Sequence, residues 1–409
     1  MRSVEEHQRV VAGLIQRRPA VRLPIAATLG LTLAEDIVAP LSLPGFDNSA
    51  MDGYAVVAED VADAAGDRPV RLPVAEDIPA GRTDPLVLQP GTAHRIVTGA
   101  PLPLGATAVV PVEATDAGTD TVAIHSPARA GQHVRTAGED VTAGTTVLLA
   151  GVVLTPAALG LAAALGLGEL AVIPRQRVLV MSTGTELVAP GTALLPGQIY
   201  ESNAVMLAAA VREAGGAVVA SPRIGDDVDA FRATLDRYAG QADLIVTTGG
   251  VSAGAYEVVK DALGGAGAAP AATSGSGEVE FSKVAMQPGM PQGAGRVGGT
   301  PVVTLPGNPV SALVSFEVFL RAPLRAAMGA PQPERPRRSA VLTEDLTSPR
   351  GKRQFRRGVF DQHTGEVMSY GPPASHHLRW LASANCLLEI PEDTHELPAG
   401  SRVDLWDLS

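Results

Sequence analysis

The chain has 409 residues, which at about 100–200 residues per domain predicts two to four domains. With 45% hydrophobic and 18% charged residues, it can build packed cores and is not a disordered scaffold. The net charge of −11 and the few aromatic residues exclude a broad nucleic-acid surface, and the single cysteine, Cys386, excludes an internal disulfide and predicts a cytoplasmic location.

The N-terminal segment predicts an amphipathic helix and no signal peptide, with Ser3 and Glu6 as a capping box. Residues 141–168 contain no charge and so imitate a membrane span. Their Gly, Thr and Pro content and their acidic flanks disfavour that interpretation. We expect instead a strand, followed by a helix that begins at Pro156 and is capped by Thr155, and no membrane association.

Composition changes along the chain predict four units. Short strands and Gly/Pro turns over residues 45–140 indicate a small β-rich domain, inserted into a connecting (linker) domain made of residues 1–44 with 141–172. Residues 173–329 alternate β-branched strands with helical segments, which is typical of a doubly wound α/β domain with a mainly parallel sheet. After a Pro/Arg-rich linker, the short strands of residues 330–409 predict a small C-terminal β-barrel.

Three strands of the α/β segment end in glycine-bearing turns that lead into helices, at 181–187, 247–257 and 305–313. In an open α/β sheet, ligands bind beyond the carboxyl ends of the strands, where glycine lets the backbone approach them. Any one of these glycines is equally well explained as a tight turn, but the three together predict a cradle for a phosphate or similar anion. We expect the strands at 177–183, 215–225, 242–250 and 300–307, and the helices near 203–214, 228–238, 255–263 and 309–322.

Acidic residues at turns are the second recurring feature. A few carboxylates combined with substrate phosphates suit Mg²⁺. Asp227 stands just before a helix, so a cap is its more common role. Glu186 directly follows a strand–glycine turn, where it would repel a phosphate unless a cation lay between them. The candidate carboxylates are Asp52, Asp140, Glu186, Asp226, Asp227 and Glu257.

Positive charge for an anion has two candidate sources, Lys283 on an apolar strand and the basic segment 352–358. Either is also compatible with a solvated surface feature. Together with Ser375, His376 and His377, the basic segment would form an oxyanion pocket, because arginine presents a planar fork of donors. The two adjacent histidines lack the spacing of a zinc pair, and no G-x-S-x-G elbow is present, so neither zinc binding nor serine–histidine catalysis is expected.

These motifs together resemble the MoeA/gephyrin E-domain family, the molybdopterin molybdenumtransferases. The resemblance runs from about residue 3 to the C-terminus, and FDNSAMDGYAV (46–56) followed by LPGNPVSA (305–312) is its most specific part. The sequence TTGGVS alone would also fit other molybdopterin-binding folds, such as the adenylyltransferase. The remaining matching segments are 95–113, 133–144, 182–187, 247–260, 283–293 and 375–391.

The resemblance implies an elongated homodimer of four-part subunits that acts in molybdenum cofactor biosynthesis. Such an enzyme inserts molybdate into adenylated molybdopterin and releases AMP with the help of Mg²⁺. Its active cleft is completed by the partner subunit's β domain, the part that carries Asp52 and Asp140 in this chain. A molybdopterin adenylyltransferase and recipient molybdoenzymes are the further partners implied; neither nucleic acid nor a membrane is expected.

Roles for individual residues follow from the same motif match. It implies catalytic roles for Asp52, Asp140, Glu186, Asp226, Asp227 and Lys283, with Glu186, Asp226 and Asp227 also as metal ligands. It implies binding of the pterin substrate or the oxyanion by Thr183, Gly184, Gly249, Gly250, Ser252, Glu257, Pro306, Gly307, Asn308, Ser311, Arg357 and Ser375.

The chain departs from the family pattern in two places. Glu257 stands where many members have aspartate, and the K-P-G-K pattern appears as QPGM at 287–290, so two lysines are missing. Either Lys283 and Arg357 suffice, or the chain prefers tungstate, or it is a weakly active or non-catalytic paralogue that binds pterin or serves as a scaffold. A further alternative is a generic nucleotide-processing relative that shares only the α/β domain.

Overall fold

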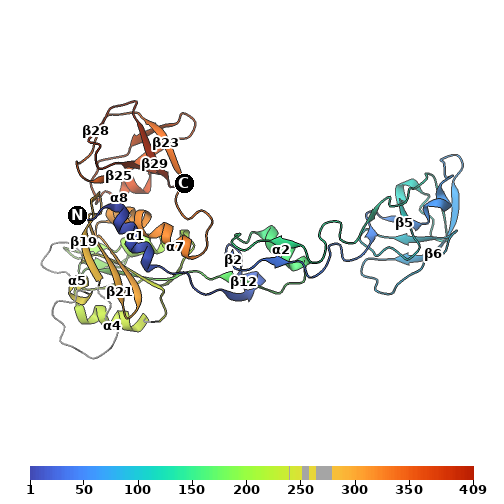
Figure 1. Cartoon of the computed structure of the whole chain (residues 1–409), viewed down its shortest axis with the longest axis horizontal. Helices are drawn as coiled ribbons and strands as arrows, with labels where there is room; N and C mark the ends of the chain where they lie inside the picture. The colour runs from blue at the N-terminus through green and yellow to red at the C-terminus, as the bar shows by residue number, and fades with distance from the viewer. Residues whose placement is uncertain (239, 251–257, 264–278) are drawn as a thin grey trace.

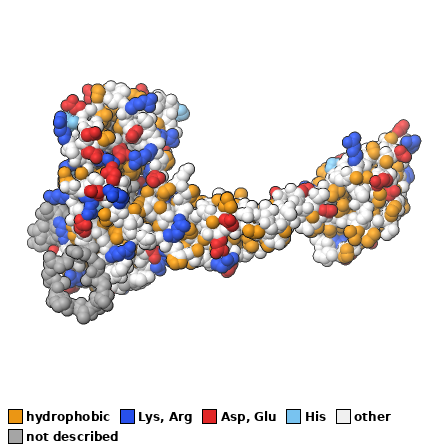
Figure 2. All heavy atoms as spheres, in the orientation of Figure 1, with side chains coloured by type: hydrophobic (Ala, Val, Ile, Leu, Met, Phe, Trp, Pro, Cys, Tyr) orange, Lys and Arg blue, Asp and Glu red, His pale blue; other side chains and the backbone are white. Residues whose placement is uncertain are grey.

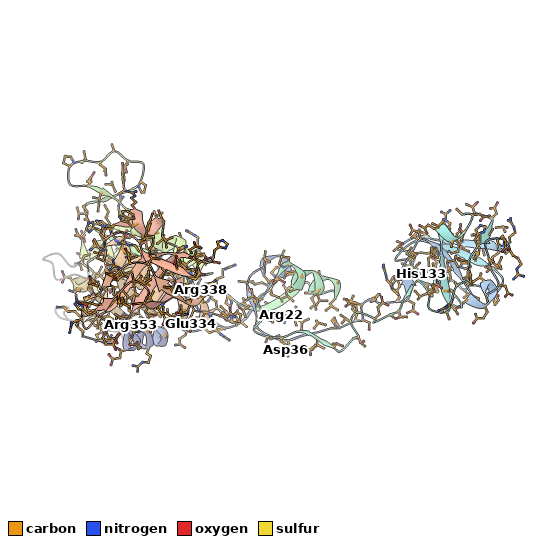
Figure 3. All side chains as sticks on the ribbon, turned by 90° about the horizontal axis from the view of Figure 1, so that it is seen from above. Arg22, Asp36, His133, Glu334, Arg338 and Arg353 are labelled. Atoms are coloured by element: carbon orange, nitrogen blue, oxygen red, sulfur yellow. The ribbon has the colours of Figure 1, made fainter. Side chains whose placement is uncertain are left out.

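The computed structural model describes residues 1–238, 240–250, 258–263 and 279–409. These residues form an elongated molecule, with an α/β unit and a β-barrel at one end, a connecting unit in the middle and a β-rich domain at the other end (Figure 1). Seen from above, Arg22 and Asp36 mark the connecting unit and His133 marks the far domain, and the parts again lie along one axis (Figure 3). The predicted multidomain α/β fold with flanking β-rich modules is confirmed.

The α/β unit contains a seven-stranded mixed sheet of order β16-β13-β18-β22-β21-β19 within the described ranges, with β17 also pairing with β13. Strands β16, β13, β18 and β22 are parallel, whereas β21 and β19 are antiparallel. Strand β13 is almost entirely buried, which explains its unbroken apolar run, as expected of a central parallel strand. The strands are β13 (Arg177–Thr183), β16 (Ala217–Ala220), β17 (Arg223–Ile224), β18 (Leu244–Thr248), β19 (Val279–Lys283), β21 (Pro291–Val297) and β22 (Thr300–Leu305), with the short pair β14 (Leu187–Val188) and β15 (Ile199–Tyr200) beside them.

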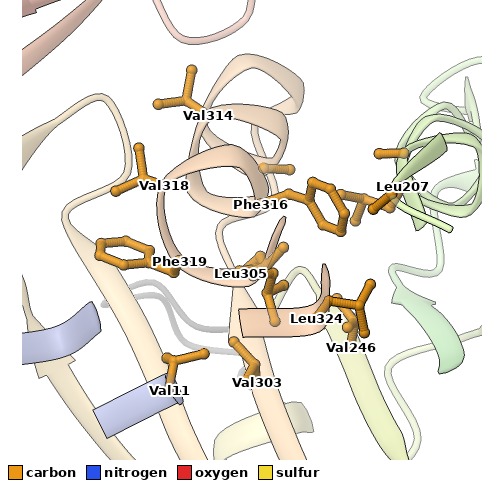
Figure 4. Close-up of a cluster of buried hydrophobic side chains, with 14 of the residues drawn as sticks. Val11, Leu207, Val246, Val303, Leu305, Val314, Phe316, Val318, Phe319 and Leu324 are labelled. Carbon is orange, nitrogen blue, oxygen red and sulfur yellow. The ribbon is translucent and has the colours of Figure 1, made fainter. Parts of the chain in front are cut away.

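The helices of this unit lie where the sequence predicts them. They cover the sheet and bury a cluster in which Phe316, Phe319 and Leu207 pack toward Val303 and Leu305 of β22 (Figure 4). The predicted helix at 309–322 is longer than expected and contains a π-helical stretch in its middle. The helices are α3 (Asn203–Glu213), α4 (Val228–Tyr238), α5 (Val258–Leu263), α6 (Pro309–Ser315), the π-helix η4 (Phe316–Arg321) and α7 (Ala322–Ala327).

The first helix, α1 (Val4–Leu14), corrects the predicted division of the chain, which placed all of residues 1–44 in the connecting domain. The helix packs on η4 and β21 of the α/β unit instead. Its predicted capping box is present, because Ser3 Oγ accepts from the Glu6 amide and the Glu6 carboxylate accepts from the Ser3 amide. The apolar face around Val11 explains the placement, since it is buried in the core of the α/β unit.

The connecting unit is built from residues on both sides of the insertion. Strand β12 pairs antiparallel with β1 and β2 over a core of aliphatic side chains. Helix α2 begins at Pro156, and Thr155 Oγ1 accepts a hydrogen bond from the Ala158 amide, as predicted. No helix within the described part of the chain is long and apolar enough to cross a membrane. The elements are β1 (Val21–Pro24), the 3-10 helix η1 (Ile25–Ala27), β2 (Thr32–Leu33), β3 (Ile37–Val38), β11 (Thr146–Leu148), α2 (Pro156–Ala164) and β12 (Glu169–Ile173).

The far domain, residues 45–140, is the distal β domain. It has a five-stranded sheet of order β8-β5-β7-β6-β9 and its own apolar cores. Tyr54 is buried in the larger core and donates its hydroxyl hydrogen to the carbonyl of Gly118. The elements are β4 (Asn48–Ser49), β5 (Gly53–Val56), η2 (Ala58–Val61), β6 (Val70–Ile78), β7 (Ala93–Ile96), β8 (Ala108–Pro111), η3 (Val112–Ala114), β9 (Thr121–Ile124) and β10 (Val134–Arg135).

The C-terminal unit is a small closed barrel. Its strands follow the order β25-β26-β23-β29-β27, and β27 pairs back onto β25, so no open edge is left in this ring. Strand β20, contributed by the α/β segment, pairs with β25 and joins the two units. The elements are β20 (Met286–Gln287), β23 (Arg337–Leu342), β24 (Leu346–Thr347), β25 (Arg353–Asp361), β26 (Glu366–Ser369), α8 (Leu378–Ala382), β27 (Cys386–Ile390), β28 (Glu396–Leu397) and β29 (Arg402–Asp407).

Candidate functional site

The carboxyl ends of three neighbouring parallel strands, β13, β18 and β22, meet at one edge of the sheet, as the sequence predicts. Asn203, the first residue of α3, ties two of them together, because its Nδ2 donates to Thr248 Oγ1 at 3.0 Å and to the carbonyl of Gly307 at 2.6 Å. Thr248 Oγ1 in turn donates to the carbonyl of Pro306 at 3.0 Å. Asn203 is not among the predicted site residues, because a position at the start of a helix gives no sign of a contact more than a hundred residues away.

The strand ends pack so closely that Gly249 has room for no side chain. A Cβ there would lie 2.7 Å from the carbonyl oxygen of Thr183 and 2.8 Å from its Oγ1, and the φ of Gly249 is +93°. Gly307 lies beside it, since a Cβ on Gly307 would be in ordinary contact, 3.4 Å, with the Gly249 Cα. The predicted binding residues Thr183, Gly184, Gly249, Gly250, Pro306 and Gly307 are therefore brought together, and at Gly249 the backbone contact and the positive φ by themselves require glycine.

Two predicted carboxylates stand at this edge. The Glu186 carboxylate bends back over Gly184, because a Cβ on Gly184 would lie 2.6 Å from Glu186 Oε2. Asp226 Oδ2 accepts from the amide and the hydroxyl of Thr185, at 3.1 and 3.0 Å. Both carboxylates are exposed, and neither has an ion-pair partner among the described residues. Two uncompensated carboxylates around one turn form a set of hard oxygen donors suited to a divalent cation.

Asp227 has a different role from the one implied for it. Its Oδ1 accepts from the amides of Asp229 and Ala230, both at 2.9 Å, so it caps helix α4. Asp227 is thus engaged as a helix cap, whereas Glu186 and Asp226 are exposed carboxylates at this turn, and metal binding by any of the three stays a prediction. Consistently, no group of three or more His, Cys, Asp or Glu side chains in the described ranges could hold a metal ion by itself.

A hollow of about 450 Å³ adjoins the end of β22, at the junction of the α/β unit and the barrel. This volume lies within the usual range of ligand sites, about 300–1,000 Å³. We call it the junction hollow. Its polar side chains come from four segments, and no Asp or Glu lines it among the described residues. It is lined by residues 286–291, Pro306, Gly307, Asn308, Ser311, Lys352, Pro373, Ala374, Ser375 and His376.

The loop that carries Ser375 is fixed to the α/β unit. Asn308 Nδ2 donates to Ser375 Oγ at 3.0 Å, and the Val310 amide donates to the Ser375 carbonyl at 3.1 Å. Because Ser375 Oγ accepts from Asn308, its own hydrogen is available to a ligand. Ser311, almost fully buried, lines the same hollow. The predicted residues Asn308, Ser311 and Ser375 therefore belong to one site.

Arg357 supports this loop rather than the hollow itself. Its guanidinium donates to the carbonyls of Ala374 at 3.2 Å, of His377 at 3.1 Å, and of Pro372. Only 4% of the residue is exposed, and burial together with the neighbouring Arg356 lowers the pKa of Arg357. Three of its five N–H groups thus hold backbone carbonyls of the loop, and Arg357 is not among the residues that line the hollow. The structure therefore shows a positioning contact, and direct binding of the oxyanion by Arg357 stays a prediction.

Lys352, not Lys283, is the lysine of the junction hollow. Lys283 ends β19, is exposed, and is absent from the residues that line the hollow. Lys352 stands immediately before β25 and lines it. The sequence did single out the basic run 352–358, but its pattern could not show which member faces the ligand. Of the predicted binding residues, Ser252 and Glu257 lie outside the described ranges.

The remaining predicted carboxylates lie far from this hollow. Asp52 is in the distal β domain, where its Oδ1 accepts from the amide and the hydroxyl of Thr98, at 2.6 and 2.8 Å. These bonds, the backbone one first, lower the pKa of Asp52, so it is a carboxylate at neutral pH. Asp140 is exposed at the neck between this domain and the connecting unit, where its amide donates to the carbonyl of Leu43. Within one chain, the domain of residues 45–140 lies at the opposite end of the molecule from the α/β unit and the barrel (Figure 1), whose residues line the junction hollow.

A second hollow, of about 470 Å³, lies between α1, η4 and the barrel. Its lining is mostly apolar and includes Phe319, Pro323 and Trp406. None of the predicted site residues lines it, and it is not at the strand ends. The junction hollow is therefore the better candidate for chemistry.

Three sequence profiles of known protein families match the chain. The sequence profile of the MoeA N-terminal region (domain I and II) matches residues 2–166, that of a probable molybdopterin binding domain matches residues 179–326, and that of the MoeA C-terminal region (domain IV) matches residues 339–408. Together these profiles cover nearly the whole chain.

Relatives match over the full length as well. The chain is 68% identical to molybdopterin molybdenumtransferase 2 of Mycobacterium tuberculosis H37Rv, over 100% of both chains. It is 38% identical to molybdopterin molybdenumtransferase 1 of the same strain, over 99% of this chain and 98% of that one. The crystal structure of the molybdopterin biosynthesis MoeA protein from Pyrococcus horikoshii superimposes with a TM-score of 0.79 at 31% identity, over 100% of this chain and 99% of that one.

Proposed function

Because the chain belongs to the MoeA family, the molybdopterin molybdenumtransferases, we propose that it inserts molybdate into adenylated molybdopterin and releases AMP. The observation that carries the proposal is the combination of two features at one edge of the sheet. The first is an anion-suited hollow with no Asp or Glu among its described lining residues, and the second is a pair of carboxylates after β13 and β17 without ion-pair partners in the described part of the chain. The first suits an oxyanion, and the second suits a cation bound to phosphates.

The glycine-bearing strand ends are the proposed site of the pterin and its phosphates. There Gly249 and Gly307 follow the ends of β18 and β22, where backbone without side chains would let a ligand approach, and Gly307 is exposed. Glu186 and Asp226 would hold Mg²⁺ together with phosphate oxygens. When bound, the ion would neutralise the phosphoanhydride charge and polarise the bond that breaks as AMP leaves. Ser311 and Ser375 would donate hydrogen bonds to the oxyanion in the junction hollow.

A second copy of the chain is the proposed source of the missing carboxylates. Asp52 and Asp140 lie in units remote from the junction hollow of their own chain, so a homodimer that brings the partner's distal β domain to the hollow would complete the cleft. Exposed large apolar side chains on the connecting unit and beside β15 are compatible with such contacts, among them Leu149, Leu195 and Val205, each at least 60% exposed. Figure 2 shows the orange side chains gathered along the connecting unit.

The proposal includes the partner enzymes and the cellular compartment. A molybdopterin adenylyltransferase would supply the substrate and recipient molybdoenzymes would take the product, in a cytoplasm whose reducing conditions suit the single buried thiol of Cys386.

The test is an AMP-release assay. Purified protein with adenylated molybdopterin, molybdate and Mg²⁺ is expected to release AMP, and Glu186→Ala and Asp52→Ala are each expected to reduce that release by about 100-fold, because each removes a charge from the reacting centre. Full release by both variants would overturn their assigned roles.

Tight binding of adenylated molybdopterin without AMP release would favour the pterin-binding or scaffold alternative, for which the missing lysines at 287 and 290 are the specific observation. Release with tungstate at lower concentrations than with molybdate would favour a tungstate-preferring transferase.

A further inference from the structure

The junction hollow has an uncompensated positive charge. Lys352 is the one lysine or arginine among its described lining residues, and no acidic side chain lines the hollow with it. Lys352 is half-buried, and none of the ion pairs between described residues involves it. A half-buried ammonium without a counter-ion favours the binding of an anion, because the anion supplies the missing charge partner.

The backbone on both sides of Lys352 is fixed. The Gly351 amide donates to the carbonyl of Glu392, and the Arg353 amide donates to the carbonyl of Ala285, both at 2.9 Å. The second bond ties the start of β25 to the segment that leads into β20, which forms another wall of the hollow. Lys352 is thus presented from an ordered position at the junction and not from a free loop.

Arg353, the residue after Lys352, pairs with the nearby carboxylates, which would otherwise compete with a ligand anion for Lys352. Arg353 forms ion pairs with Glu5 at 2.5 Å, with Glu392 at 3.0 Å and with Glu389 at 3.4 Å. None of these three acids lines the hollow, so they are paired with Arg353 outside it. The charge of Lys352 remains available within it.

Neutral donors complete the set. Gln354 Nε2 donates to Gln287 Oε1 at 3.0 Å, which leaves the Nε2 hydrogens of Gln287 available at the wall of the hollow. Ser375 also has a free hydroxyl hydrogen because its oxygen accepts from Asn308. One ammonium surrounded by amide and hydroxyl donors suits a small tetrahedral oxyanion, which has acceptor oxygens in every direction.

We propose that Lys352 is the charged ligand of the oxyanion substrate in this chain and so takes the place of the lysines missing at 287 and 290. The inference rests on the proposed function of the junction hollow and adds a specificity-determining residue to it. Because a single, half-exposed ammonium supplies the attraction, oxyanion binding should weaken steeply as ionic strength rises.

The experiment compares Lys352→Gln with Arg350→Gln in the full chain. Arg350 is exposed two residues earlier and does not line the hollow, so its substitution is a matched loss of one positive charge. Lys352→Gln is expected to raise the apparent KM for molybdate by about tenfold, with kcat changed less than about twofold, since one charge-assisted hydrogen bond is lost. Lys352→Arg should restore most of the affinity, and Arg350→Gln should behave as wild type.

Direct binding gives a readout independent of turnover. Titration calorimetry with molybdate should show about tenfold weaker binding to Lys352→Gln and a loss of most of the salt dependence seen in the wild type. Equal KM and binding constants for Lys352→Gln and the wild type would overturn the inference while leaving the proposed function intact. A wild type that releases no AMP with any oxyanion, yet binds molybdate through Lys352, would overturn the proposed function alone.

Discussion

The junction hollow and the distal β domain carry opposite chemistry. The hollow has a lysine, two serines and amide donors without a carboxylate among its described lining, whereas the distal domain contributes Asp52, a carboxylate held ionised by Thr98. An anion suits the first, and a cation or a hydrogen-bond donor suits the second. Since one chain holds these two kinds of group in separate units, the proposed reaction, if it uses both, requires a second chain.

Removing the distal β domain is expected to have the largest effect on AMP release. Leu43 and Val141 exchange backbone hydrogen bonds, so a short glycine turn in place of residues 45–140 would close the gap, and the domain's cores are separate from the rest. AMP release should fall by about 100-fold or more, because the carboxylates of the cleft are lost. Circular dichroism and thermal melting would check that the remaining units stay folded.

Mixing variants would show whether the cleft is shared between chains. In a heterodimer of the deletion chain with a Glu186→Ala chain, one of two equivalent clefts has an intact hollow and a distal domain, so about half of the wild-type activity per dimer should return. No recovery in isolated heterodimers would contradict a cleft built across subunits, and full activity of the deletion chain alone would show that the two regions are not both needed.

Adding positive charge to the hollow is expected to have a moderate effect on the apparent KM for molybdate. Gln287→Lys with Met290→Lys places two cations on a wall that already faces Lys352. The apparent KM for molybdate is expected to fall about fivefold, since each new ammonium offers a charge-assisted hydrogen bond. An unchanged KM at several salt concentrations would show that positions 287 and 290 do not contact the oxyanion here.

The smallest effect on AMP release is expected from Asp227, the residue that caps helix α4. Asp227→Ala should lower the free energy of unfolding by about 1 kcal/mol and leave AMP release nearly unchanged, because Asp227 caps α4. Asp226→Asn should do the reverse and reduce AMP release with little change in stability. Urea unfolding and the AMP-release assay on both variants separate the role of a helix cap from that of a metal ligand. Loss of AMP release in Asp227→Ala would show that Asp227 also belongs to the proposed metal site.

Much of the fold could be predicted because it depends on local patterns. The run RVLVMST predicted β13 at its observed bounds, since a strand buried on both faces must be apolar throughout. Thr155 with Pro156 and Ser3 with Glu6 marked two helix starts through hydrogen bonds that span only three residues. The position of α1 could not be predicted in this way, because its apolar face would suit any nearby core and only packing selected that of the α/β unit.

The sequence could predict which residues lie at the candidate site, but not the role of each residue there. Glycine-bearing strand ends identified the edge of the sheet, since parallel strands bring their carboxyl ends together. Asp226 and Asp227 are adjacent carboxylates, and the sequence offered no means to distinguish them. The fold decided, because the start of α4 turns Asp227 toward its own helix and leaves Asp226 beside Thr185.

The sequence by itself determined the family, the order of the units and the set of residues from which the site is drawn, because these are recorded in contiguous motifs. Only the tertiary structure decided that Arg357 supports a loop, that Lys352 rather than Lys283 lines the hollow, and that Asn203 ties the strand ends together. Those assignments depend on where a donor points and which distant acceptor it meets, and such contacts between segments leave no trace in local spacing.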